Sequence, residues 1–438
     1  MSKYLKGGAW ALIERAVTMV FGVLVSVVMA RKLGPGLMGE FSYMMALSGI
    51  FAALVPVGMQ RILVRDLVRN PEQSPALLWT SLIVRQVSAF IGFILLLIIT
   101  VFLDGIGNTF WLAVCFGTML WSLAFEVFGE YFQAQVRYEI FVKARLAGLI
   151  ISAPVQVLTV LAGWPLYAIA LGFVSRFWLD ALFLFLFYKR EHYPKEGRCF
   201  SKGLAKEMLV DGIPLALSAL ASIVYTRSDM IMLRHMQGSE AAGLYGVAGQ
   251  IYSPLYALFP LIGGILYPAV VQAKKDGDSA YWQKLEQLLS LHVGLGAVAL
   301  IFLLLAGHWI VSLLFGAVYA ESANILMILT ILLIVQGMGL ASSAWFITES
   351  ETKLALQRNV MGLIVNIALN WWLIPVWSGR GAAVASVMAY FMSMHLALLM
   401  MKKTRPLFRL QTRVLTFIPV IKWGLYYARR YLNFSRSV

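Results

Sequence analysis

Charged side chains within long apolar stretches are the residues of this sequence most suited to chemistry. Arg176 and Asp180 stand four positions apart in the apolar stretch 166–187, so on a helix they share one face. Arg176 would lie ~15 Å into that helix, near the middle of a membrane. An arginine can bind a phosphate through two parallel hydrogen bonds, and an aspartate can orient it. The pair predicts either a site for a pyrophosphate or acidic sugar, or an ion pair that joins helices.

Two further arginines, Arg85 and Arg15, stand several residues inside apolar stretches, close to the basic ends of those stretches. Each could line an entrance that attracts a diphosphate, because a guanidinium suits bidentate phosphate contacts. Each could instead extend along its helix to the lipid headgroups, which is the favoured interpretation, more clearly for Arg15. Glu14 precedes Arg15 directly and therefore cannot share its face.

Arg227 and Asp229 stand two positions apart in the outer third of the stretch 209–233, so their side chains point in different directions. We expect Arg227 to face a substrate path, although contacts between helices would also explain both residues. A charge inside a membrane costs at least ~3 kcal/mol, so each requires a partner or a function.

Glu126 and Glu130 lie one turn apart in the stretch 109–134, where two carboxylates on one face repel each other. One of them could carry a proton or help to hold a cation for ion coupling. The favoured alternative is that Glu130 is solvated near the inner surface and that Glu126 pairs with an arginine.

Metal and cofactor chemistry is not expected. His292 and His395 are isolated in apolar stretches without metal-ligand spacing, which predicts core packing. Cys115 falls in an apolar run and Cys199 in a basic segment, so neither a disulfide nor a cysteine metal site is expected.

The elements that must position these residues are membrane-spanning helices. Of the 438 residues, 60% are hydrophobic and only 13% are charged, far from the balance of a soluble domain. The apolar runs are ~20 residues long, as an α-helix needs to cross the bilayer, and not the ~10-residue alternating segments of a barrel. The sequence predicts an all-α polytopic membrane protein with about twelve spans, at 9–30, 41–62, 80–103, 109–134, 146–163, 166–187, 209–233, 244–270, 287–307, 323–347, 357–376 and 380–401.

The distribution of basic residues predicts the topology. With the N-terminus in the cytoplasm, 27 of the 36 lysines and arginines fall on the inner side. The outer loops hold only Arg31, Lys32, Arg234 and Arg380. The net charge of +15 is therefore a topological signal, and no nucleic-acid motif accompanies it. Both termini are predicted to be cytoplasmic.

The basic segment 188–208 predicts a division of the chain. We expect an N-terminal six-helix lobe (1–187), a cytoplasmic linker (188–208), a C-terminal six-helix lobe (209–401) and a basic tail (402–438). Within the tail, 414–428 is too short and interrupted for a span and predicts an interfacial helix on the inner leaflet.

The two halves also look related. An arginine, Arg31 or Arg234, ends the first span of each half, and Gly39 or Gly243 opens the next one. Six spans per copy predict a parallel repeat about an axis along the membrane normal.

The segment 30–43 (Ala-Arg-Lys-Leu-Gly-Pro-Gly-Leu-Met-Gly-Glu-Phe-Ser-Tyr) resembles the signature after the first helix of Wzx-type polysaccharide flippases of the MOP exporter superfamily. The likeness covers roughly residues 1–400. Its further matches, in chain order, are Gly212-Ile213-Pro214, Arg227 to Leu233, Ala242 to Tyr245, Leu314-Phe315-Gly316 with Tyr319, Arg358-Asn359 with Asn366, and Gly379 to Ala383.

This resemblance implies a V-shaped bundle of two lobes that works by alternating access in the bacterial inner membrane. It implies a lipid-linked oligosaccharide on a polyprenyl (undecaprenyl) diphosphate as cargo, for O-antigen, lipopolysaccharide or other surface polysaccharide. It implies no enzymatic activity. Membrane lipids and a polysaccharide polymerase are the expected partners.

Two other functions remain open. A MATE-like ion-coupled drug antiporter belongs to the same superfamily, but embedded arginines suit an anionic cargo better than a cationic drug. A membrane-embedded polysaccharide polymerase or ligase would be expected to carry a large outer loop, which the sequence lacks. No Walker phosphate loop is present, so ATP is not the expected source of energy.

Overall fold

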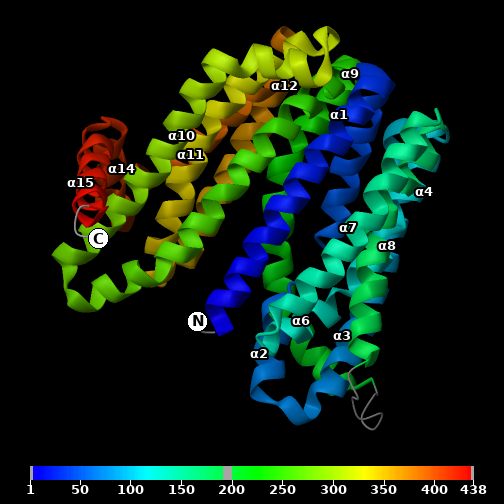
Figure 1. Cartoon of the computed structure of the whole chain (residues 1–438), viewed down its shortest axis with the longest axis horizontal. Helices are drawn as coiled ribbons and strands as arrows, with labels where there is room; N and C mark the ends of the chain where they lie inside the picture. The colour runs from blue at the N-terminus through cyan, green and yellow to red at the C-terminus, as the bar shows by residue number, and fades with distance from the viewer. Residues whose placement is uncertain (1–2, 191–199, 436–438) are drawn as a thin grey trace. The chain divides into compact units, whose positions relative to one another are not determined.

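A computed structural model describes residues 3–190 and 200–435, and within them every regular element is a helix (Figure 1). Cys199 and most of the predicted linker 188–208 lie outside the described residues. The chain is a multi-pass helical membrane protein, as the apolar runs predicted. The long helices are α1 (Lys3–Ala52), α3 (Ser74–Asp104), α7 (Tyr138–Leu161), α8 (Leu166–Arg190), α9 (Lys202–Asp276), α10 (Asp278–Phe315), α11 (Ala320–Thr348) and α12 (Thr352–Phe391).

Nine helical stretches within the described residues are long and apolar enough to cross a membrane. Three of them contain a break: α1 at Gly34, α9 at Gly238 and α12 at Ser378. Figure 1 shows that α1 reverses its direction, and the break in this helix is at Gly34. Dividing these three stretches at their breaks gives twelve segments, which agrees with the predicted number of spans.

Each turn on the predicted outer side contains a residue with a positive φ angle. At Gly34 the φ angle is 70° and at Gly238 it is 86°, a region that glycine enters without steric cost. Pro35 follows Gly34 and starts the next helix with its fixed φ. The full set is Gly34, Gly105 and Gly163 in the first half of the chain, and Gly238, Gly316 and Ser378 in the second. Each half of the chain thus has three such outer turns.

Two predicted spans differ from the observed helices. The span predicted at 41–62 ends at Ala52, where the chain enters a series of turns with Val57 at a φ of 49°. Pro56 lies in these turns, which suit a residue without a backbone donor. A separate amphipathic helix, α2 (Gln60–Arg69), follows.

The span predicted at 109–134 is interrupted at Thr118 and Phe125. It consists of α4 (Asn108–Gly117), α5 (Met119–Ala124) and α6 (Glu126–Ala134).

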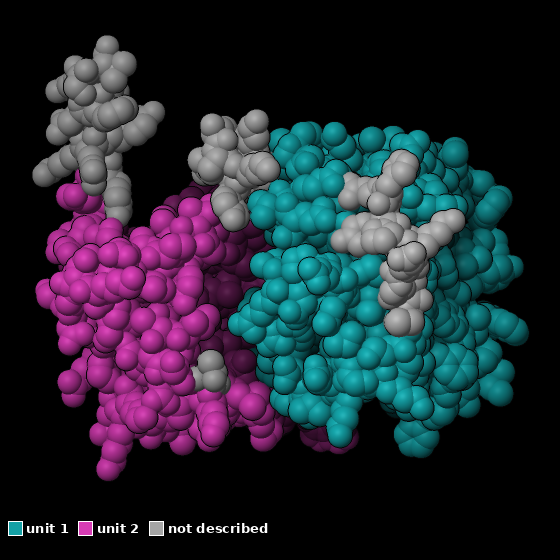
Figure 2. Space-filling model, turned by 90° about the horizontal axis from the view of Figure 1, so that it is seen from below, with its two compact units in different colours: residues 1–231 teal, residues 232–438 magenta. Residues whose placement is uncertain are grey.

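The chain forms two compact units, residues 1–231 and 232–438 (Figure 2). Their boundary falls inside α9, whereas the sequence predicted a division at 188–208. The start of α9 belongs to the first unit because Gly212 packs directly on the Val57 carbonyl and the Ser201 amide donates to Thr80 Oγ1 at 3.1 Å.

The second unit includes the basic tail. Its last helices are α14 (Arg405–Leu415) and α15 (Ile418–Ser435), which contact α10. Leu407 and Val414 of α14 are fully buried in the core of this unit. The tail is therefore packed into the protein and does not only rest on a membrane surface.

His292 and His395 are both buried in this unit. His292 is fully buried, with Nδ1 2.8 Å from the Leu288 carbonyl oxygen and Nε2 3.2 Å from that of Phe259. His395 contacts Gln411 Oε1 through Nδ1 at 2.9 Å. These contacts agree with the predicted packing role.

Candidate functional site

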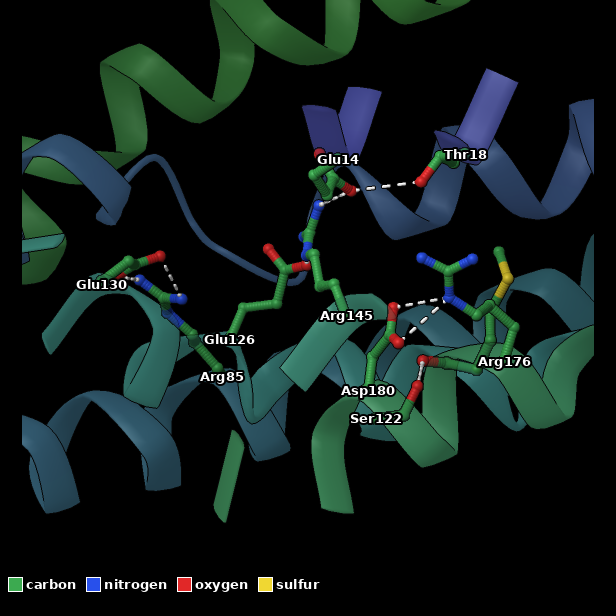
Figure 3. Close-up of polar contacts among 10 residues, drawn as sticks. Glu14, Thr18, Arg85, Ser122, Glu126, Glu130, Arg145, Arg176 and Asp180 are labelled. Atoms are coloured by element: carbon green, nitrogen blue, oxygen red, sulfur yellow. Dashed lines mark hydrogen bonds and ion pairs between the residues drawn. The ribbon is translucent and has the colours of Figure 1, made fainter. Parts of the chain in front are cut away.

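Arg176 and Asp180 on α8 form the ion pair that their spacing predicted. Arg176 Nε lies 3.0 Å from Asp180 Oδ1 and 2.9 Å from Oδ2. Both side chains are largely but not fully buried, with 14% and 17% of their surfaces exposed. Among the described residues, the hydrogen bonds of Arg176 use Nε alone, and its two terminal nitrogens point away from Asp180 (Figure 3). The guanidinium is oriented and keeps its outer donors for another anion.

Arg145 on α7 joins three helices beside this pair. Its Nη2 lies 2.6 Å from Glu126 Oε1 on α6, and its Nη1 lies 3.9 Å from Glu14 Oε1 on α1. Thr18 Oγ1 donates to the same Glu14 oxygen at 3.3 Å. The guanidinium also lies over the Phe141 ring, 4.6 Å from its centre. The favoured interpretation of Glu126, pairing with an arginine, is what the structure contains.

Gly148, one turn after Arg145, brings α7 against α8. A Cβ atom at this position would overlap the Asp180 carboxylate and crowd the Asp180 backbone amide at 3.1 Å. Helices approach this closely only where one of them lacks a side chain. The glycine therefore sets the spacing between Arg145 and the Arg176 pair.

Arg85 and Glu130 form a second, fully internal ion pair between α3 and α6. Arg85 Nη1 lies 2.9 Å from Glu130 Oε1 and Nη2 lies 2.7 Å from Oε2. Only 1% and 6% of the two side chains are exposed. Arg85 therefore neither extends to headgroups nor lines an open entrance, and Glu130 is not solvated. Both expectations fail because each side chain satisfies the other inside the helix bundle.

A charge track in the first unit is formed by the paired side chains of Arg85, Arg145, Arg176, Glu14, Glu126, Glu130 and Asp180 (Figure 3). Counted at ~1.5 Å per residue from the helix ends on the predicted outer side, Arg176 lies ~15 Å deep, Asp180 ~21 Å, Arg145 ~24 Å and Arg85 ~29 Å. A hydrocarbon core is ~30 Å thick, so the track runs from the middle of the membrane to its predicted inner edge. The track comprises three arginines and four carboxylates. Arg176 is its member nearest the middle of the membrane, and its two terminal nitrogens make no hydrogen bond within the described residues.

Arg227 on α9 is a second arginine near the middle of the membrane, and it has no carboxylate partner among the described residues. It lies ~16 Å from the turn at Gly238, deeper than the outer third predicted for it. Its side chain is half-buried, and Nε lies 3.8 Å from the position that a Cβ of Gly49 would occupy. Asp229 is buried, so the two residues differ in environment as their spacing predicted.

Arg15 on α1 is exposed and has no ion pair within the described residues. It lies next to Glu14, which contacts Arg145 instead. The sequence missed Arg145 as a functional candidate, because its place near the predicted inner end of a span made it look like a topological signal. The glycine one helical turn further on was the available indication of close packing.

Comparisons with known proteins give the family. Residues 4–274, more than half of the chain, match the family described as polysaccharide biosynthesis protein. The chain is a member of this family. The resemblance recognised from the sequence motifs is thereby confirmed.

A curated relative supports the assignment. The capsular polysaccharide biosynthesis protein CapF of Staphylococcus aureus is 24% identical over 192 residues. That match covers 43% of this chain, and the chain spans about half (48%) of the length of CapF.

Solved structures of MOP-superfamily transporters share the fold of this family member. The inward closed conformation of the lipid II flippase MurJ matches with a TM-score of 0.74 at 15% identity, covering 99% of both chains. The inward-facing conformation of a MATE multidrug transporter matches with a TM-score of 0.65 at 14% identity, covering 90% of this chain and 95% of the other. These likenesses establish the all-α fold of MOP transporters.

Proposed function

We propose that this protein is a flippase. It moves an oligosaccharide linked to undecaprenyl diphosphate across the bacterial inner membrane by alternating access, for the synthesis of a surface polysaccharide. The observation that carries the proposal is Arg176, a mid-membrane guanidinium held by Asp180 through Nε while its terminal nitrogens remain available. A diphosphate offers the acceptor geometry that such a guanidinium binds. Membership of a polysaccharide biosynthesis family supports the sugar-bearing cargo.

A MATE-like drug antiporter is the second candidate, and likeness to MATE structures supports it at the level of the fold. The embedded residues favour the flippase. The carboxylates of the track pair with arginines. The terminal nitrogens of Arg176 and the whole guanidinium of Arg227, which has no carboxylate partner among the described residues, are available to an anion near the middle of the membrane. These donors suit an anionic cargo better than a cationic drug.

The proposal has consequences for activity, partners and location. The protein acts as a transporter and not as an enzyme such as a polymerase or ligase. Both termini are cytoplasmic, because the basic segments then lie inside. Its partners are the lipid-linked cargo, membrane lipids and the polymerase that consumes the flipped product.

Complementation of a deletion strain tests the proposal. R176A should abolish surface polysaccharide and cause lipid-linked oligosaccharide to accumulate on the inner leaflet, at normal protein abundance. R176K should restore part of the activity, since lysine keeps the charge but not the bidentate geometry. The control R69A removes an exposed arginine of α2 and should leave polysaccharide unchanged.

Two outcomes would contradict the proposal. Normal polysaccharide with R176A would remove Arg176 from the transport path. A deletion strain that keeps its polysaccharide but becomes sensitive to cationic dyes would favour the antiporter.

A further inference from the structure

The C-terminal helices α14 and α15 lie beside α10 in the second unit (Figure 1). Two adjoining recesses lie between these helices. The first is a basic recess of about 580 Å³ at the start of α10, lined by Arg409, Arg413 and Lys422. Its acidic residue, Glu286, is already engaged: it accepts from Trp423 Nε1 at 3.1 Å and pairs with Arg413 at 3.4 Å. Arg409 and Lys422 are exposed. Lys422 Nζ lies over the Trp423 ring, 5.2 Å from its centre.

The second recess is an apolar groove of about 640 Å³ between the end of α9, α10 and α15. Leu291, Leu295, Val298 and Ile301 form its α10 wall and are all at least one-third exposed. On α15, a Cβ at Gly424 would contact nothing within 4 Å, so this residue leaves the groove open.

The two recesses share Trp423 and therefore form one continuous surface. The indole is 7% exposed and is fixed by its hydrogen bond to Glu286, so it forms a rigid wall between the basic and apolar parts. Tryptophan is favoured where a polar headgroup region meets hydrocarbon. The surface thus offers cations at one end, an aromatic boundary and an apolar channel at the other end.

We propose that this surface is a binding site for one anionic phospholipid of the inner leaflet. The phosphate lies against Arg409 and Lys422, and an acyl chain lies in the groove along α10. The α10 wall from Lys284 to Ile301 extends ~26 Å at ~1.5 Å per residue, enough to span a ~15 Å leaflet and its headgroup region. The bound lipid joins α15 to α10 at the predicted cytoplasmic edge. This inference is independent of the cargo, because every residue in it lies outside the charge track of the first unit.

Native mass spectrometry of the full chain in detergent tests the site with palmitoyl-oleoyl phosphatidylglycerol and the matched phosphatidylcholine. The wild type should retain phosphatidylglycerol in preference to phosphatidylcholine. R409Q and K422Q should each weaken phosphatidylglycerol binding by about fivefold, as expected for one cation near an anionic headgroup. K402Q removes an exposed lysine of the same tail outside the recess and should bind like the wild type.

A separate variant tests the apolar groove. G424F fills the groove and should weaken the binding of both lipids, whereas I421F enlarges an exposed α15 side chain outside the groove and should not. Equal retention of the two lipids by the wild type would overturn the proposal, as would a phosphatidylglycerol preference that survives R409Q and K422Q. Displacement of phosphatidylglycerol by equimolar undecaprenyl phosphate would also overturn it, because the site would then belong to the cargo.

Discussion

Replacing Arg85 by methionine should destabilise the protein strongly. The substitution removes the hydrogen bonds of 2.9 and 2.7 Å to Glu130 and leaves that carboxylate unpaired with 5% of the residue exposed. Removing one partner of a buried ion pair costs about 3–5 kcal/mol. At ~2–4 °C per kcal/mol for a unit of this size, the unfolding midpoint should fall by about 6–20 °C. Tryptophan fluorescence during thermal unfolding in detergent measures it.

The double variant R85M/E130L tests whether the stability lost in R85M comes from the unpaired Glu130 carboxylate. Two apolar side chains leave no buried charge, so the double variant should recover at least half of the stability that R85M loses. R65M is the matched control. The Arg65 side chain is 42% exposed, and its contacts with Asp66 and Asp211 are surface pairs worth at most ~1 kcal/mol each, so the midpoint should move much less than in R85M.

The reasoning would be refuted if R85M unfolds at the wild-type temperature, or if the double variant is less stable than both single variants. The stable double variant also answers a functional question. If it supports normal surface polysaccharide, Arg85 serves the structure of the helix bundle and not the path of the cargo.

Two glycine substitutions give further tests. G148V should place its methyl groups on the Asp180 carboxylate and separate it from its arginine partner, which should reduce surface polysaccharide at normal protein abundance; G22V, at a site with no neighbour within 4 Å, should be tolerated. G381V should lower the amount of folded protein in membranes, because its Cβ would overlap the Leu373 carbonyl oxygen; wild-type abundance by quantitative immunoblot would contradict this close approach.

Much of the fold could be predicted because the membrane imposes simple rules on sequence. The length of hydrocarbon that a helix must cross gave the number of spans, and the breaks at Gly34, Gly238 and Ser378 agree with it. Helix ends were predicted less well. Hydropathy continues through the turns around Val57, where backbone geometry and not polarity ends the span.

The site was predictable only where its contacts are local. Arg176 and Asp180 are four residues apart on one helix, so their spacing alone predicted the pair. Arg85 and Glu130 are 45 residues apart, and no periodicity within a helix can show that they meet. Arg145 meets carboxylates from two other helices, so its role depends on how the bundle packs.

The turns on the predicted outer side of the first unit are too short to lengthen when helices move. Gly34 alone breaks α1, three residues join α3 to α4, and four join α7 to α8. Such short connections hold no spare chain, so one helix of a hairpin cannot slide along its axis without carrying its neighbour. Hinge movements are confined to longer connections such as the turns that follow Ala52. The smallest part of this unit that can move by itself is therefore at least a pair of helices, and the three-residue connection from α6 to α7 joins two such pairs.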